Sequence, residues 1–142
     1  IMALNLSVFD TVSQANSGAV LHLTVPGSGV PAYLDEGVKN PKKPLTITLL
    51  GLDSDEYTKY VQVKARARRK SNKKDDIDIE QSIQDACELY AKLTVGWENI
   101  PDKEGNAMPF TFENAVNLYK SFKDIRVQVG NFIAEQENFI KS

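Results

Sequence analysis

The sequence is poor in the residues on which most catalytic and metal sites depend. Among its 142 residues it has one histidine, His22, and one cysteine, Cys87. A single cysteine excludes a disulfide within the chain, and the lack of a cysteine or histidine cluster excludes the common zinc patterns. No glycine-rich loop follows a strand and opens a helix, as a phosphate cradle requires. These absences predict a protein that is not an enzyme and that holds no metal or other cofactor.

Long apolar runs and a strong net charge are missing as well. No segment approaches the ~20 apolar residues of a membrane span, so we expect no membrane contact. The 17 basic and 19 acidic residues give a net charge of -2, which argues against a general polyanion binder. With 42% hydrophobic and 25% charged residues, the composition predicts one globular domain over residues 1–142.

The rare residues and the acidic runs have ordinary structural explanations. His22 alternates with leucines in a predicted strand, and Cys87 falls on the apolar stripe of a predicted helix. A free cysteine in that position behaves as a small hydrophobic residue. The acidic runs 53–56 and 75–78 stand where helices are expected to begin, and negative charge is favoured there. We therefore expect no nucleophile and no cation site at these positions.

The first part of the chain, residues 1–52, has the pattern of strands and loops. Residues 19–25 and 45–50 alternate apolar and polar side chains and are rich in types that favour strands. Prolines and glycines separate the two runs, which predicts a loop between antiparallel strands. Residues 4–8 also alternate, and we expect a short edge strand or an arm there.

The second part, residues 53–142, has helical spacing. Asp53 and Glu56 form the pattern of a capping box, which predicts the start of the first helix. A second helix is expected from Asp78 to about Gly96, after a flexible basic and acidic linker near residues 69–77.

Two further helices complete the prediction. The third begins after Thr111, which can cap it, and a break near Lys123 or Asp124 separates it from the last. The fold class is therefore α+β, with an N-terminal antiparallel β-hairpin or small sheet followed by a bundle of about four helices.

A dense basic patch follows the first predicted helical turns. Contacts with several phosphates would give nucleic-acid binding that depends on salt. No aromatic residue is interleaved to stack bases, so nucleic acid is the less favoured partner. A solvated face and an acidic protein partner remain the alternatives. The patch consists of Lys64, Arg66, Arg68, Arg69, Lys70, Lys73 and Lys74.

Aromatic residues supply the candidate protein interface. Trp97, the one tryptophan, stands between a helix and a loop rich in proline and glycine. It can fill the core beneath that loop or anchor a partner, since tryptophan is enriched at interface hot spots. The candidate interface residues are Trp97, Phe110, Phe132 and Phe139.

Two segments, residues 44–57 and residues 93–112, together resemble the phage tail assembly chaperone family. The first is PLTITLLGLDSDEY at residues 44–57, where a strand, a glycine and an Asp-Ser pair precede an aromatic residue and a basic helix. The second is LTVGWENIPDKEGNAMPFTF at residues 93–112, which continues into the next helix. The NFI triplet at 131–133, with the related NFI at 138–140, is similar to the closing helix of that family.

The resemblance implies a function in tail morphogenesis of long-tailed phages. A protein of that family binds the tape measure protein and recruits tail tube subunits. It is expected in the host cytoplasm during assembly and not in the mature virion, and self-association is possible. Two other functions stay open, namely a structural head–tail connector or tail terminator and a nucleic-acid-binding regulator that uses the basic helix.

Overall fold

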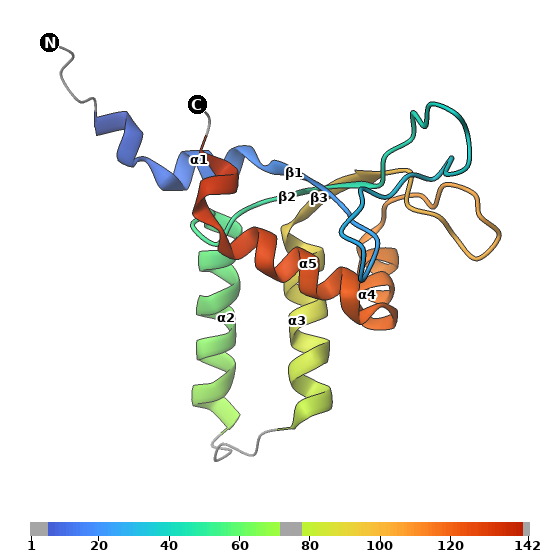
Figure 1. Cartoon of the computed structure of the whole chain (residues 1–142). Coiled ribbons are helices and arrows are strands. Elements are labelled where there is room, and N and C mark those ends of the chain that lie inside the picture. Colours follow the sequence, from blue (N-terminus) through green and yellow to red (C-terminus); the bar gives the residue numbers. More distant parts are fainter. Residues whose placement is uncertain (1–5, 72–77, 141–142) are drawn as a thin grey trace, which may run out of the picture.

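The computed structural model describes residues 6–71 and 78–140, and for residues 68–71 it describes the backbone alone. Its elements follow a mixed order in which one strand lies between two groups of helices (Figure 1). They are the 3₁₀ helix η1 (Leu6–Phe9), α1 (Thr11–Ser17), β1 (Ala19–His22), β2 (Thr46–Leu49), α2 (Asp55–Ser71), α3 (Ile79–Leu93), β3 (Thr94–Glu98), α4 (Phe112–Ser121), α5 (Lys123–Ala134) and the 3₁₀ helix η2 (Gln136–Phe139). This confirms the predicted α+β class.

The three strands form one antiparallel sheet in the order β1-β2-β3. Leu21 lies opposite Ile47 on β2, and Ile47 lies opposite Trp97 on β3. The pairing of β1 with β2 agrees with the predicted hairpin. The third strand was not predicted, because residues 94–98 were assigned to the end of a helix and to a loop. Thr94, Val95 and Trp97 are types that favour strands, so the local signal was present.

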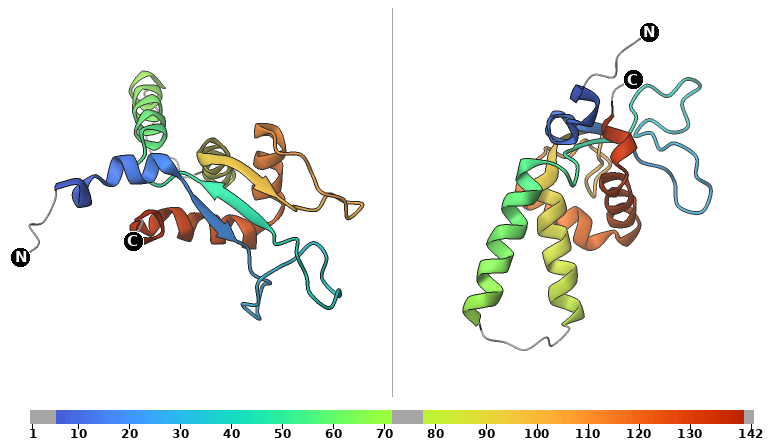
Figure 2. Two further views of the ribbon diagram at one scale, coloured as in Figure 1. Left: turned by 90° about the horizontal axis from the view of Figure 1, so that it is seen from above. Right: turned by 90° about the vertical axis from the view of Figure 1, so that its left-hand side faces the viewer.

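One face of the sheet carries the core. Ile47 and Leu49 have no exposed surface, and they pack in one cluster with helical residues that include Cys87, Tyr119 and Val129. Figure 2 (left) looks down on the sheet and shows α3, α4 and α5 beneath it. The outward face keeps Val20 and Val95 more than half exposed, at 60% and 56%. The alternation along β2 therefore separates a buried face from an open one.

The N-terminal segment differs from the prediction. Residues 6–9 form a 3₁₀ turn, and α1 follows with Asp10 accepting a hydrogen bond from the amide of Ser13. That cap begins α1 after the range 4–8, and the described part of that range, residues 6–8, lies in the 3₁₀ turn and not in an edge strand. The alternation that suggested a strand begins at Leu4, which lies outside the described residues. Because Leu6, Val8 and Phe9 are exposed, no sheet contact fixes them as a strand.

Several helix boundaries also required correction. Ser54, not Asp53, caps α2: its hydroxyl accepts from the amide of Tyr57, and Ser54 is fully buried. Asp53 instead accepts a hydrogen bond from Gln136. The second helix ends at Leu93 rather than near Gly96.

The remaining boundaries are closer to the prediction. The break after α4 lies at Phe122, next to the predicted position. The last helix ends at Ala134, so Phe139 belongs to η2. The predicted linker near 69–77 begins inside α2, which runs to Ser71, and its remainder falls at 72–77, outside the described residues.

Helices α2 and α3 stand away from the sheet as a long helical pair (Figures 1 and 2). Helix α3 also packs against α4 and buries Cys87, Ala91 and Leu93, and both helices keep exposed residues on their other sides. Among the described helices, none is both long and apolar enough to cross a lipid bilayer.

Candidate protein-binding surfaces

The first aromatic pair closes a loop over the sheet. Trp97 on β3 donates a hydrogen bond from Nε1 to the carbonyl of Met108 at 2.9 Å. Its ring meets Phe110 edge-on, with centroids 5.1 Å apart. Both side chains are half-buried against the core. The tryptophan therefore holds the loop of residues 99–110 in place, and only part of its ring is open to a partner.

The second aromatic pair closes the C-terminal end. Phe132 on α5 meets Phe139 on η2 edge-on, with centroids 5.6 Å apart. Phe139 is 4% exposed, so its ring stabilises this end from inside the domain. Phe132 is half-buried. The four predicted interface residues thus form two separate pairs, and their part in binding stays a prediction.

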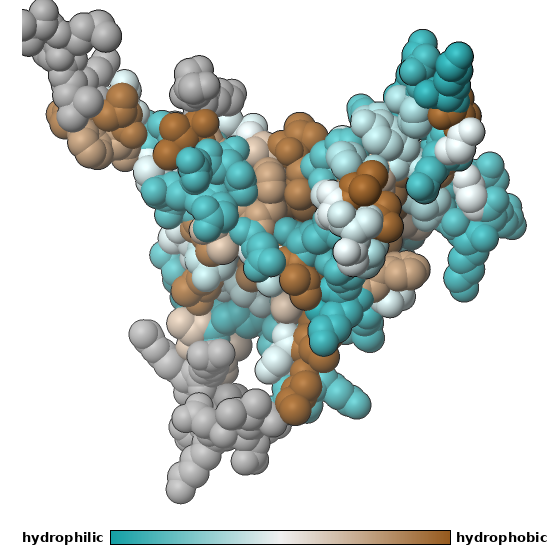
Figure 3. Space-filling view, in the orientation of Figure 1, coloured by the Kyte–Doolittle hydropathy of each residue, from teal (hydrophilic) through white to brown (hydrophobic). Residues whose placement is uncertain are grey.

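A groove between α3 and α5 offers a more accessible apolar surface. Its open volume is about 550 Å³. Ile79 is 70% exposed at one end, and Val127 is 46% exposed on the opposite helix. Figure 3 shows hydrophobic surface along the lower part of α3. The lining residues are Ile79, Ser82, Ile83, Ala86, Tyr90, Arg126, Val127, Gly130 and Asn131.

The floor of the groove is fixed by close packing. A Cβ on Gly130 would lie 2.7 Å from the Tyr90 hydroxyl, so glycine lets that ring lie against α5. Burial raises the pKa of the Tyr90 hydroxyl above its ordinary value. Arg126 donates to the carbonyl of Tyr119 at 2.9 Å and adds positive charge to the rim. The groove therefore combines an apolar floor with one cation.

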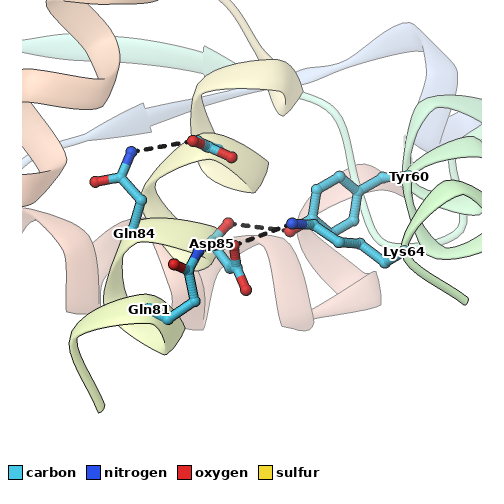
Figure 4. A network of polar contacts seen from close by, with 6 residues as sticks. Tyr60, Lys64, Gln81, Gln84 and Asp85 are labelled. Atoms are coloured by element: carbon cyan, nitrogen blue, oxygen red, sulfur yellow. Dashed lines mark hydrogen bonds and ion pairs between the residues drawn. The ribbon is translucent and has the colours of Figure 1, made fainter. Parts of the chain in front are cut away.

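Beside the groove, a polar network joins α2 to α3 (Figure 4). Lys64 pairs with Asp85 at 3.0 Å, and the Tyr60 hydroxyl donates to the Asp85 carbonyl at 3.1 Å. Gln81 donates to the same carboxylate. The hydrogen bond to Asp85 raises the pKa of Lys64. Since both charged side chains are about a third exposed, such a pair contributes about 0–1 kcal/mol.

The predicted basic patch is divided by this network. Lys64 faces α3 and is engaged with Asp85, whereas Arg66 is exposed. Among the residues that the structure describes, Arg66 makes no ion pair. Arg68, Arg69 and Lys70 lie on the last turns of α2, with their side chains outside the description, and Lys73 and Lys74 lie outside the described residues. Among the residues of the basic patch, the structure therefore describes the side chains of Lys64 and Arg66 alone.

The rare residues of the sequence occupy structural positions. His22 contacts the carbonyl of Ala32 at 2.9 Å and meets Tyr33 edge-on. Cys87 is fully buried in the core, so its thiol has no access to solvent. Within residues 6–71 and 78–140, no three His, Cys, Asp or Glu side chains gather where they could hold a metal ion.

These features define a small α+β domain with a groove between α3 and α5 and with exposed apolar residues on its described surface. The model of the YdaY prophage protein family matches residues 52–142, from just before α2 to the end of the chain. The match covers more than half of the chain, so the protein belongs to the YdaY prophage protein family and is phage-related. No curated protein and no solved structure matches the chain. The α3–α5 groove lies entirely inside the matched segment.

The groove was not predicted as a site, although the sequence contained part of the signal. Ile79 and Ile83 stand at helical spacing on the apolar stripe of the second predicted helix, the same stripe that contains Cys87. Their exposure depends on where α5 crosses α3, which helical spacing does not determine. A second signal is Gly130, because a glycine in the interior of a helix often marks a position where a neighbouring group packs closely against the backbone.

Proposed function

We propose that the protein is a tail assembly chaperone of a long-tailed phage. In this function it binds the tape measure protein and recruits tail tube subunits, without catalysing a reaction. It acts in the host cytoplasm during assembly and is absent from the mature virion. Membership of a prophage family supports the phage context. The resemblance of residues 44–57 and 93–112 to the chaperone family supports the specific function.

The observation that carries the proposal is the open groove between α3 and α5. A tape measure protein is long and helical, and an amphipathic helix binds by laying apolar residues into a groove of this kind. Ile79 and Val127 are exposed at 70% and 46%, so both can contact an incoming helix. Arg126 on the rim would favour an acidic residue beside the apolar face of that helix.

Co-expression tests the proposal. The protein is produced with the tape measure protein encoded in the same prophage, and the amount retained on the affinity-tagged chain is measured. The double variant Ile79→Asp/Val127→Asp places two charges in the groove. Both side chains are exposed in the free protein, so we expect normal folding and a loss of retained partner of roughly tenfold or more.

A matched control separates the groove from general surface effects. Val30→Asp/Val38→Asp adds the same two charges to the loop between β1 and β2, where the valines are 55% and 57% exposed. This variant is expected to retain the partner fully. Equal losses in both variants would argue against the groove. A wild-type protein that retains no tape measure protein, yet occurs at fixed copy number in purified virions, would favour a head–tail connector or terminator instead.

A further inference from the structure

Charge is strongly segregated along this chain. Residues 59–74 contain eight basic residues and no acidic one, whereas the rest of the sequence contains nine basic and nineteen acidic residues. A net charge of -2 therefore conceals two regions of opposite sign. Such segregation creates a directional field around the molecule and favours oriented association.

The basic region presents a free helical face. Lys59, Val63 and Arg66 follow one another at steps of four and three residues, so they lie on one side of α2. All three are exposed, Val63 at 55%. The opposite side of the helix is engaged with α3 through Tyr60 and Lys64. We call the exposed side, defined by Lys59, Gln62, Val63 and Arg66, the basic face.

A second exposed surface lies where α1, the start of α2 and η2 meet. Asn16 on α1 donates to Asp55, and Gln136 on η2 donates to Asp53. These contacts gather three segments, residues 6–17, 50–58 and 133–140, that contain no basic residue. We call this surface the acidic end. Its acidic residues are Asp10, Asp53, Asp55, Glu56, Glu135 and Glu137.

The acidic end is also apolar at its surface. Leu6 is 81% exposed and Phe9 is 64% exposed, on a 3₁₀ helix that buries no residue. Ile140, at the other edge of this end, is 49% exposed. Figure 3 shows hydrophobic surface on the N-terminal segment that projects from the body. Exposed apolar residues with charge at their rim are typical of a contact surface rather than of a solvated one.

We infer that the basic face of one copy docks on the acidic end of a second copy. The two surfaces are complementary in charge, and each offers exposed apolar side chains. They lie at different places on the chain, the acidic end at the start of α2 and Arg66 near its far end (Figure 1). One copy therefore uses different surfaces toward its two neighbours. A head-to-tail contact with two different neighbours produces an open chain or a ring, whereas a two-fold dimer would have to form the same contact twice between two copies.

Sedimentation analysis with paired charge reversals tests this contact on the protein of residues 1–142. At about 50 mM salt the average mass is expected to rise above 15.8 kDa with concentration, and at about 1 M salt, where the screening length falls to ~3 Å, it returns to the monomer value. Lys59→Glu/Arg66→Glu makes both surfaces acidic, and Glu135→Lys/Glu137→Lys weakens the acidic end. Each variant alone is expected to stay monomeric.

Mixing the two variants provides the decisive comparison. In the mixture, the unchanged acidic end of the first variant meets the unchanged basic face of the second, so one contact of the wild-type kind can form between two unlike copies. Association should therefore return. Lys39→Glu/Lys103→Glu, an equal change of charge on two exposed lysines elsewhere, should associate as the wild type does. Circular dichroism confirms that every variant is folded.

Three results would overturn the inference. They are a wild-type monomer at every concentration in low salt, association that neither salt nor charge reversal changes, and a mixture that fails to associate. A monomer whose basic face instead retains an oligonucleotide or an acidic polypeptide would also overturn it, by assigning that face to a foreign partner. None of these readouts uses the α3–α5 groove, so failure here is distinguishable from failure of the proposed chaperone function.

Discussion

A buried hydroxyl pair joins the end of α3 to α4, and its removal gives a quantitative test of the core. Thr94 donates to the carbonyl of Tyr90 at 2.6 Å, and the Thr94 and Tyr119 hydroxyl oxygens are 2.7 Å apart. Because the single proton of Thr94 is used on Tyr90, the Tyr119 hydroxyl donates to Thr94. Tyr119 has no exposed surface and Thr94 is 7% exposed, so water cannot replace either partner.

The two single substitutions are expected to differ. Tyr119→Phe removes one hydrogen bond and should lower the free energy of unfolding by about 1 kcal/mol. Thr94→Val leaves both the Tyr119 hydroxyl and the Tyr90 carbonyl without this partner, so its cost should be larger, about 2–3 kcal/mol. At this chain length each kcal/mol lowers the melting temperature by roughly 3–4 °C.

The double variant Thr94→Val/Tyr119→Phe completes the cycle. Either single substitution already removes the Thr94–Tyr119 hydrogen bond. The loss of unfolding free energy in the double variant should therefore be about 1 kcal/mol smaller than the sum of the two single losses. Urea unfolding followed by circular dichroism measures all four proteins. Additive costs, or a Thr94→Val that costs less than Tyr119→Phe, would refute the assignment of donor and acceptor.

Three further predictions follow from the same packing. Burial raises the pKa of Tyr119 to about 12, above the value of about 10 in an unfolded chain. The stability that this raised pKa contributes is fully present below pH ~10 and is lost as the pH rises toward ~12. Tyr119→Phe should therefore make the unfolding free energy fall less steeply between these two pH values. An unchanged slope in the variant would contradict the burial of the Tyr119 hydroxyl. Gly51→Ala would place a Cβ 3.1 Å from both Ala15 and the Phe139 ring. The substitution should lower the free energy of unfolding, measured in urea, by about 1–3 kcal/mol. A more stable variant would show that α1 and η2 pack loosely around Gly51. The thiol of Cys87 is fully buried and should react with a thiol reagent only at the rate of opening, so fast labelling of the native protein would count against this core.

The sheet shows what local sequence pattern can and cannot determine. Alternation in residues 45–50 was sufficient to predict β2 and its inward residues, Ile47 and Leu49. The same reasoning missed β3, because Gly96 was taken as the end of a helix. The helix ends before Gly96 because of Thr94. Its hydroxyl forms hydrogen bonds with the Tyr90 carbonyl and the Tyr119 hydroxyl, at the point where the chain changes from α3 to β3. That second contact is 25 residues away, so no local pattern reports it.

The candidate binding surfaces were harder to predict from the sequence than the fold, because the exposure of a residue depends on which elements pack against it. Helical spacing identifies an apolar stripe, but it does not say whether a neighbour covers the stripe. Ile79 and Ile83 both line the α3–α5 groove, yet Ile79, the first residue of α3, is 70% exposed. Phe139 was predicted as an interface residue and is 4% exposed, since Phe132 covers it. The exposed fractions of Ile79 and Phe139 both depend on how the helices pack in the tertiary structure, which the spacing of residues in one sequence does not determine.

Co-expression followed by affinity capture decides whether the proposed α3–α5 groove holds a tape measure protein. We expect that the wild-type chain and the loop control Val30→Asp/Val38→Asp retain the tape measure protein of the same prophage. The groove variant Ile79→Asp/Val127→Asp should retain roughly tenfold less or none, while its melting temperature is unchanged. Equal retention by the groove variant and the wild type would contradict the proposal.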